Sequence, residues 1–209
     1  LLRPTDAGEE AVAESAGLKA RVMDVESYAT QEAFRLIAPS LPANGRDQNI
    51  ALVDIGAHVS HFYVLRNNQI LFSRDQAFGG NQLTQDIQRA FNLSSEEAES
   101  ARKNQGLPEN YDHDVLQPFM ESLALEVTRA LQFFFTSTSY NQVDQIVLAG
   151  GCALLPGLDE LVAKRAGVAT VVANPFASMQ TSERIRPRQL VQDAPMLLIA
   201  TGLAMRSFE

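Results

Sequence analysis

Short apolar runs separated by polar turns occupy the middle of the chain and predict a group of β-strands. The run 50–64 begins as an apolar segment of β type, meets an acid and a glycine, and resumes as an alternating strand. Asn67-Asn68 is typical of a turn, and residues 69–75 alternate again. We therefore predict a three-stranded antiparallel meander over residues 50–75.

Apolar residues at helical spacing predict helices on both sides of this meander. Leu83, Ile87 and Phe91 lie one helical turn apart, and Ser94 with Glu97 forms a capping box that starts a further helix. With glycines and prolines as stops, helices are expected over 7–16, 26–37, 81–91, 94–106, 115–140, 158–165 and 190–205, and further strands over 22–25, 145–149 and 168–172.

The segment 39–45 contains two prolines and a glycine and is the best candidate for a domain boundary. We expect residues 1–38 to be a remnant of a first domain with a connecting strand and helix. Residues 39–209 would then form a second domain with a mostly helical subdomain inserted at about 81–140.

The first candidate site is the turn that follows the apolar run. Successive backbone N–H groups in a tight turn make an anion-binding concavity, and Gly56, Ala57 and His58 would supply them. Glycine permits the close approach of a phosphate. Beside an oligophosphate, Asp54 is expected to bind Mg²⁺ through water. The alternative is an ordinary hairpin with an acid in its turn.

The second candidate site follows the strand at 145–149. This strand ends in Gly150-Gly151, and a helix follows. A strand, a double glycine and a helix amino terminus in this order allow a nucleotide to lie against bare backbone. We therefore expect both glycines to contact a nucleotide.

Composition describes a globular chain. Its 209 residues are 45% hydrophobic, the formal net charge is -8, and no Lys/Arg cluster is evident, which disfavours a nucleic-acid or anionic-membrane surface. No apolar run is long enough to span a bilayer. The single cysteine, Cys152, excludes an internal disulfide. The first residue is Leu1, so we do not expect a natural start.

The order of these motifs resembles the second half of the actin-like ATPase fold, an α/β fold of the ribonuclease H-like type. Within that superfamily the resemblance is closest to the PilM family of cytoplasmic type IV pilus assembly proteins. The residues that carry it are Ala16-Gly17-Leu18, Val22-Met23-Asp24-Val25-Glu26, Asp54-Ile55-Gly56-Ala57, Gly79-Gly80 with Leu83-Thr84, Gly150-Gly151 with Pro156-Gly157, Asn174-Pro175-Phe176, and the ending from Ala194-Pro195 to Gly202-Leu203-Ala204-Met205-Arg206.

The resemblance also implies roles for single residues. The second phosphate loop would comprise Asp54, Gly56, Ala57 and His58, the adenosine motif Gly150 and Gly151, and a turn lining the cleft Gly79 and Gly80. Glu99 and Lys103 match a helix of the inserted subdomain that reaches the ribose and base. His61 stands where actin has a histidine near the attacking water, so its role is either catalytic or cross-strand packing.

The implied function is that of an ATP- and Mg²⁺-binding scaffold, at most a weak ATPase. Such a protein is needed for pilus biogenesis and twitching motility. It lies at the cytoplasmic face of the inner membrane without inserting, and its expected partners are the amino-terminal tail of PilN, other pilus assembly proteins and a second copy of itself. The family's first phosphate loop is missing from this chain.

Two alternatives belong to the same superfamily. A small-molecule kinase would need a positioned base for an acceptor hydroxyl, and the loop after Gly56 offers only Ala57 and His58. A cell-division ATPase resembling FtsA is disfavoured because no basic amphipathic helix precedes Glu209.

Overall fold

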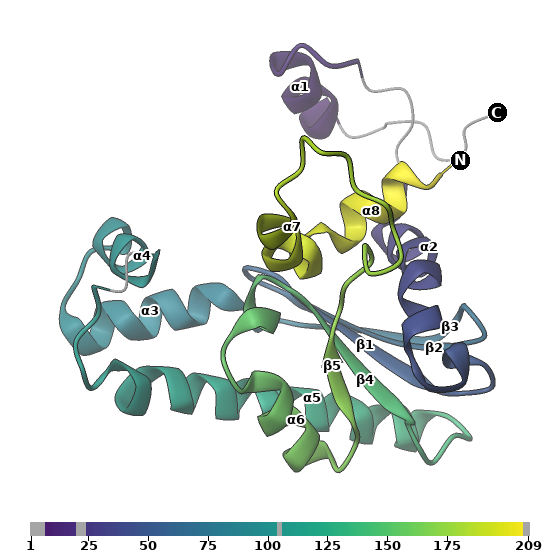
Figure 1. Cartoon of the computed structure of the whole chain (residues 1–209). Coiled ribbons are helices and arrows are strands. Elements are labelled where there is room, and N and C mark those ends of the chain that lie inside the picture. Colours follow the sequence, from purple (N-terminus) through teal and green to yellow (C-terminus); the bar gives the residue numbers. More distant parts are fainter. Residues whose placement is uncertain (1–6, 20–23, 104–105, 207–209) are drawn as a thin grey trace.

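A mixed five-stranded sheet forms the centre of the computed structural model, which describes residues 7–19, 24–103 and 106–206 (Figure 1). The strands are β1 (Ile50–Ile55), β2 (Ser60–Arg66), β3 (Gln69–Gln76), β4 (Gln145–Gly150) and β5 (Thr170–Val172), in the order β3-β2-β1-β4-β5. The meander β1-β2-β3 is antiparallel, as predicted, and β4 and β5 run parallel to β1. The carboxyl ends of β1 and β4 therefore lie at the same edge of the sheet.

Helices cover both faces of this sheet. In chain order they are α1 (Ala7–Ser15), α2 (Glu26–Ile37), α3 (Gly80–Phe91), α4 (Ser95–Lys103), α5 (Gln117–Ser137), α6 (Leu158–Ala166), α7 (Pro187–Asp193) and α8 (Leu198–Ala204). One core joins α5 and α6 to one face, and a second core joins α2 and α8 to the other. β1 is buried throughout because its alternate side chains enter the two cores.

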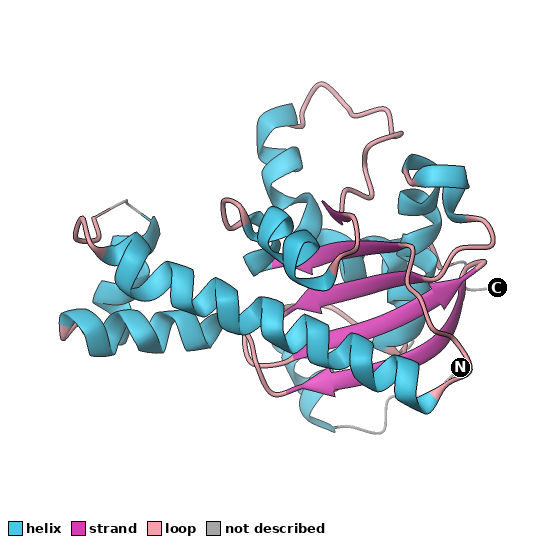
Figure 2. Ribbon diagram, turned by 90° about the horizontal axis from the view of Figure 1, so that it is seen from below, coloured by secondary structure: helices cyan, strands magenta, loops and turns pink. Residues whose placement is uncertain are grey.

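The inserted region extends away from the sheet. Figure 2 shows α3 and α4 projecting with the start of α5 beyond the strands. The predicted capping box is present, because the Ser94 amide donates to Glu97 at 2.8 Å and the Glu97 amide donates to the Ser94 hydroxyl at 3.3 Å. The division of the chain into a remnant, a second domain and an insertion stays a prediction.

Several predicted elements have different bounds. The expected helix over 190–205 is broken into α7, a 3₁₀ turn at Ala194–Leu197 and α8, because Pro195 cannot donate to the helical ladder. A π-helical segment, Asp112–Leu116, precedes α5. The helix expected over 94–106 ends at Lys103, and β5 is shorter than predicted. Of the strand expected over 22–25, the first two residues lie outside the described part, and Asp24 and Val25 belong to no strand.

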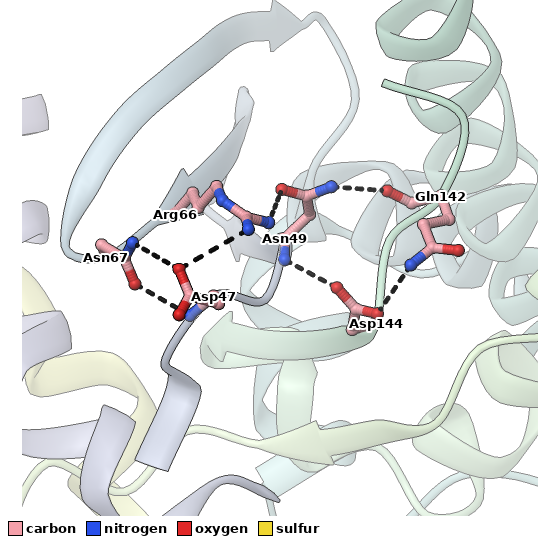
Figure 3. Close-up of polar contacts among 6 residues, drawn as sticks. All are labelled: Asp47, Asn49, Arg66, Asn67, Gln142 and Asp144. Atoms are coloured by element: carbon pink, nitrogen blue, oxygen red, sulfur yellow. Dashed lines mark hydrogen bonds and ion pairs between the residues drawn. The ribbon is translucent and has the colours of Figure 1, made fainter. Parts of the chain in front are cut away.

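A polar network fixes the other end of the sheet. Figure 3 shows its six members, Asp47, Asn49, Arg66, Asn67, Gln142 and Asp144. The side-chain oxygen of the buried Asn49 accepts one hydrogen bond from Arg66 at 3.2 Å. Asn49 donates its side-chain amide to the Gln142 carbonyl at 3.0 Å and its backbone amide to Asp144 at 2.7 Å. These bonds tie the starts of β1 and β4 to the end of β2 and hold the parallel register.

Candidate functional site

A cleft of about 630 Å³ opens at the carboxyl ends of β1 and β4. This volume lies in the range of small-molecule sites. Eight of the predicted residues line it: Asp54, Gly56, Ala57, His61, Gly80, Glu99, Gly150 and Gly151. Segments far apart in sequence thus meet at one place, since Ile55 pairs with Gly150 in the β1–β4 ladder.

Two predicted residues, Gly79 and His58, do not line the cleft. Gly79 packs against the carbonyl groups of Gly56 and Ala57. His58 contacts Asn81, whose side-chain nitrogen lies 3.1 Å from a ring nitrogen of His58. Lys103 ends α4, but its side chain is outside the described part of the chain.

Asp54 is a buried carboxyl at the end of β1, 8% exposed. Burial and, to a smaller extent, the nearby charge of Glu26 raise the pKa of Asp54 from 3.8 to about 6, against the lowering effect of His61. Among the described residues, Asp54 makes no ion pair and accepts no hydrogen bond on its side chain. A buried carboxyl without a donor favours a cation, which would restore its ionised form.

His61 pairs with Asp54 across the β1–β2 ladder. Its Nδ1 lies 2.8 Å from Asp75, its Nε2 lies 3.5 Å from Glu26, and its ring stacks on Tyr63 at 6.4 Å between centroids. Both ring nitrogens therefore face acids, which orients the imidazole at the wall of the cleft. The structure thus shows His61 packed across the strands, and a catalytic role for it stays a prediction.

The loop after β1 is closed by its own backbone. The Gly56 amide donates to the Val59 carbonyl at 3.1 Å, so the expectation that it would face a phosphate is wrong. The amides of Ala57 and His58 donate to no backbone carbonyl in the described ranges. The loop thus offers two of the three expected donors.

The double glycine at 79 and 80 braces this loop. The Gly80 amide donates to the Gly56 carbonyl at 2.9 Å, and the Asn81 amide donates to the Ala57 carbonyl at 2.8 Å. A Cβ on Gly79 would lie 2.5 Å from the Ala57 carbonyl oxygen and 2.6 Å from that of Gly56. Gly79 is therefore required by contact between two loops, while Gly80 reaches the cleft.

In the second double glycine, Gly150-Gly151, one residue is likewise required by the fold and the other faces the cleft. Gly150 has a φ of 84°, and a Cβ there would collide with the Ile55 carbonyl and lie 2.7 Å from the Asp54 carboxylate. Gly151 is different, because its nearest neighbour would be the Met196 sulfur at 3.7 Å, an ordinary contact. Gly150 is needed by the fold, and Gly151 leaves a bare surface in the cleft.

Sequence reasoning missed several residues that complete the walls. Glu26 comes from the first turn of α2 and Arg102 from α4. Cys152 lies between the glycines and the insertion, where burial raises the pKa of its thiol and Arg102 lowers it. The apolar side is formed by Leu154, Leu155, Met196 and Ile199. Of these missed residues, only Arg102 could have been found from the sequence, because it directly precedes the predicted Lys103.

This sheet order, with helices on both faces and a cleft at the ends of β1 and β4, defines the fold of the actin-like ATPases. The chain belongs to the family described as type IV pilus assembly protein PilM, whose model matches residues 7–208. No helix in the described ranges is long and apolar enough to cross a membrane.

Solved structures with this fold resemble the chain. A PilM-PilN type IV pilus biogenesis complex is 28% identical, with a TM-score of 0.81 over 96% of this chain and 56% of that one. MreB 5 of Spiroplasma citri bound to AMPPNP, at 15% identity and a TM-score of 0.59 over 95% of this chain and 62% of that one, shows the fold alone.

A curated relative is the ethanolamine utilization protein EutJ of Escherichia coli (strain K12), which is 25% identical over 154 residues, 74% of this chain and 48% of EutJ. The chain thus spans about half the length of the relatives it matches.

Proposed function

We propose that this chain supplies one wall of an ATP site in an actin-like component of the type IV pilus assembly complex. The whole protein would lie at the cytoplasmic face of the inner membrane, bind the PilN tail as a nucleotide-dependent adaptor, and serve pilus biogenesis and twitching motility. Membership of the PilM family and the likeness to a PilM-PilN complex support this assignment. We expect at most weak ATPase activity.

One observation carries the nucleotide site. The desolvated carboxyl of Asp54 lies directly beside the backbone of Gly150, and the bare backbone of Gly151 lines the same cleft of nucleotide size. Apolar side chains flank the glycines on one side, and Arg102 lies toward the inserted subdomain. An adenosine would lie on Gly151 against Leu155 and Met196, with its phosphates directed to the loop after β1.

The residues present also fit Mg²⁺ as a companion of the nucleotide. No cluster of three or more ligating side chains occurs in the described ranges, so the protein alone does not form a cage for a metal. Mg²⁺ is commonly held by one or two carboxylates together with phosphate oxygens, and Asp54 is the carboxylate in position. When bound, the ion neutralises phosphate charge. His61 and Glu26 would orient water at the same wall.

The isolated chain should nevertheless bind ATP weakly. Phosphate affinity in this fold is shared between two loops that face each other, and this chain carries one of them. Each lost hydrogen bond to a charged oxygen costs about 1.5–3 kcal/mol. Losing two weakens binding by roughly two to four orders of magnitude.

Amide chemical shifts detect such weak binding and also locate it. On titration of the 209-residue chain with Mg-ATP, we expect fast-exchange shifts at His58, Gly80 and Gly151, with none at the Asn49 network. Shifts elsewhere, or none at millimolar ligand, would contradict the nucleotide site. Micromolar affinity by calorimetry would instead show that one loop suffices. A PilN-tail peptide should not bind, because the family's groove lies mostly in the first domain.

A further inference from the structure

The segment between β5 and α7, together with the first residues of α7, concentrates positive charge on an otherwise acidic protein. Arg184, Arg186 and Arg188 lie within five residues of one another, while the whole chain has a formal net charge of -8. All three side chains are exposed, and none makes an ion pair in the part of the chain that the structure describes. The only acid between β5 and α7 is Glu183.

The same segment exposes apolar side chains. Every residue from 177 to 189 is exposed, and Met179 and Ile185 are 42% and 43% exposed. Neither belongs to a hydrophobic core of the described residues. Figure 1 shows this stretch as a loop that rises away from the sheet before the chain enters α7. Apolar side chains therefore project among arginines at a protruding tip.

We propose that the tip formed by residues 177–188, which comprises the loop and the start of α7, docks on an anionic membrane surface. The arginines would contact lipid phosphates, while Met179 and Ile185 enter the headgroup region. A folded acidic protein would need charges at fixed spacing, whereas the loop is irregular, with a turn closed by the Ile185 amide on the Ser182 carbonyl at 2.9 Å. Mobile lipid headgroups require no fixed spacing. The inference is independent of the nucleotide site.

This differs from the expectation drawn from the net charge and from the lack of an evident Lys/Arg cluster, which disfavoured an anionic surface; the three arginines alternate with Ile185 and Pro187 and so form no continuous basic run. Charge far from a contact is screened within about 8 Å at physiological ionic strength. The local positive charge of the tip therefore determines its attraction to the anionic membrane. The acidic remainder of the protein is repelled by the membrane, which orients the tip toward the lipid.

Vesicle flotation of the 209-residue chain tests the proposal. We expect binding to phosphatidylcholine vesicles that contain phosphatidylglycerol and none to phosphatidylcholine alone. Replacing all three arginines with glutamine (R184Q/R186Q/R188Q) should weaken partitioning about a hundredfold, since each Arg near an anionic surface contributes about fivefold. Ile185→Ser should weaken it severalfold, and this loss should persist at higher salt.

The matched control removes the same charge elsewhere. R35Q/R129Q/R165Q deletes three arginines that are held by Glu32, Glu126 and Glu121 on other faces. It should keep vesicle binding and an unchanged thermal transition. Equal losses in both triple variants, or no binding to anionic vesicles, would overturn the proposal. Binding to soluble polyglutamate but not to vesicles would also overturn it and would indicate an acidic protein partner.

Discussion

Replacing Asp54 with asparagine should make the empty protein more stable above neutral pH. Burial and the charge of Glu26 raise the pKa of this carboxyl from 3.8 to about 6. Because the folded-state pKa is raised, the stabilisation from the neutral carboxyl is fully present below the unfolded pKa and is lost as pH rises through about 6. The full loss amounts to about 3 kcal/mol at roughly 1.4 kcal/mol per unit of pKa.

Urea unfolding of both proteins at two pH values measures this effect. Between about pH 5 and about pH 8 the advantage of Asp54→Asn should grow by roughly 1.4 kcal/mol, the part of the linkage that falls in this window. Asp112→Asn, at an exposed position, is the matched control and should show no such growth. An equal effect of Asp54→Asn at both pH values would refute the desolvation argument. The same variant should lose Mg²⁺-dependent ATP binding.

Further predictions concern glycines and the polar network. Gly151→Val should keep the thermal transition and abolish ATP-induced amide shifts in the cleft, whereas Gly150→Val should fail to fold stably, because it combines a positive φ with a collision. Gly202→Ala should lower the free energy of unfolding by about 1–3 kcal/mol through overpacking against α2, while Leu203→Ala at an exposed neighbour should change it by less than about 0.5 kcal/mol. Asn49→Ala should lower the free energy of unfolding by about 1–3 kcal/mol, because the groups that bond to the buried Asn49 side chain lose their partner. Urea unfolding measures the free-energy change for each of these variants.

The meander was predictable because local alternation and turn residues agree with its final environment. The terminal helix was not, since the apolar spacing of 190–205 continues through Pro195 and hides the break. The break between α7 and α8 is needed for tertiary packing. It lets α8 approach α2 so closely that Gly202 lies against the Ala29 carbonyl, a contact that no local pattern announces.

The residues of the cleft also fall into a predictable and an unpredictable group. Asp54, Gly56, Gly150 and Gly151 were predictable because strand ends and glycines mark the chain turns that form it. Glu26 was missed because it reaches Asp54 and His61 only through the packing of α2 on the sheet. Likewise, the Gly56 amide was assigned to phosphate because sequence does not show the turn bond that uses it.

The charges around the cleft predict that nucleotide affinity depends more on Mg²⁺ than on the number of phosphates. Glu26, Asp54 and Glu99 line it, while the described lining has Arg102 as its fixed cation, and His61 is held between Glu26 and Asp75. A free triphosphate would therefore meet like charge at the end of β1. Mg²⁺ carried on the phosphates would reverse that sign beside Asp54 and so favour the ionised carboxylate. ATP without Mg²⁺ should consequently bind this wall more weakly than ADP with Mg²⁺, although it has one more phosphate to contact.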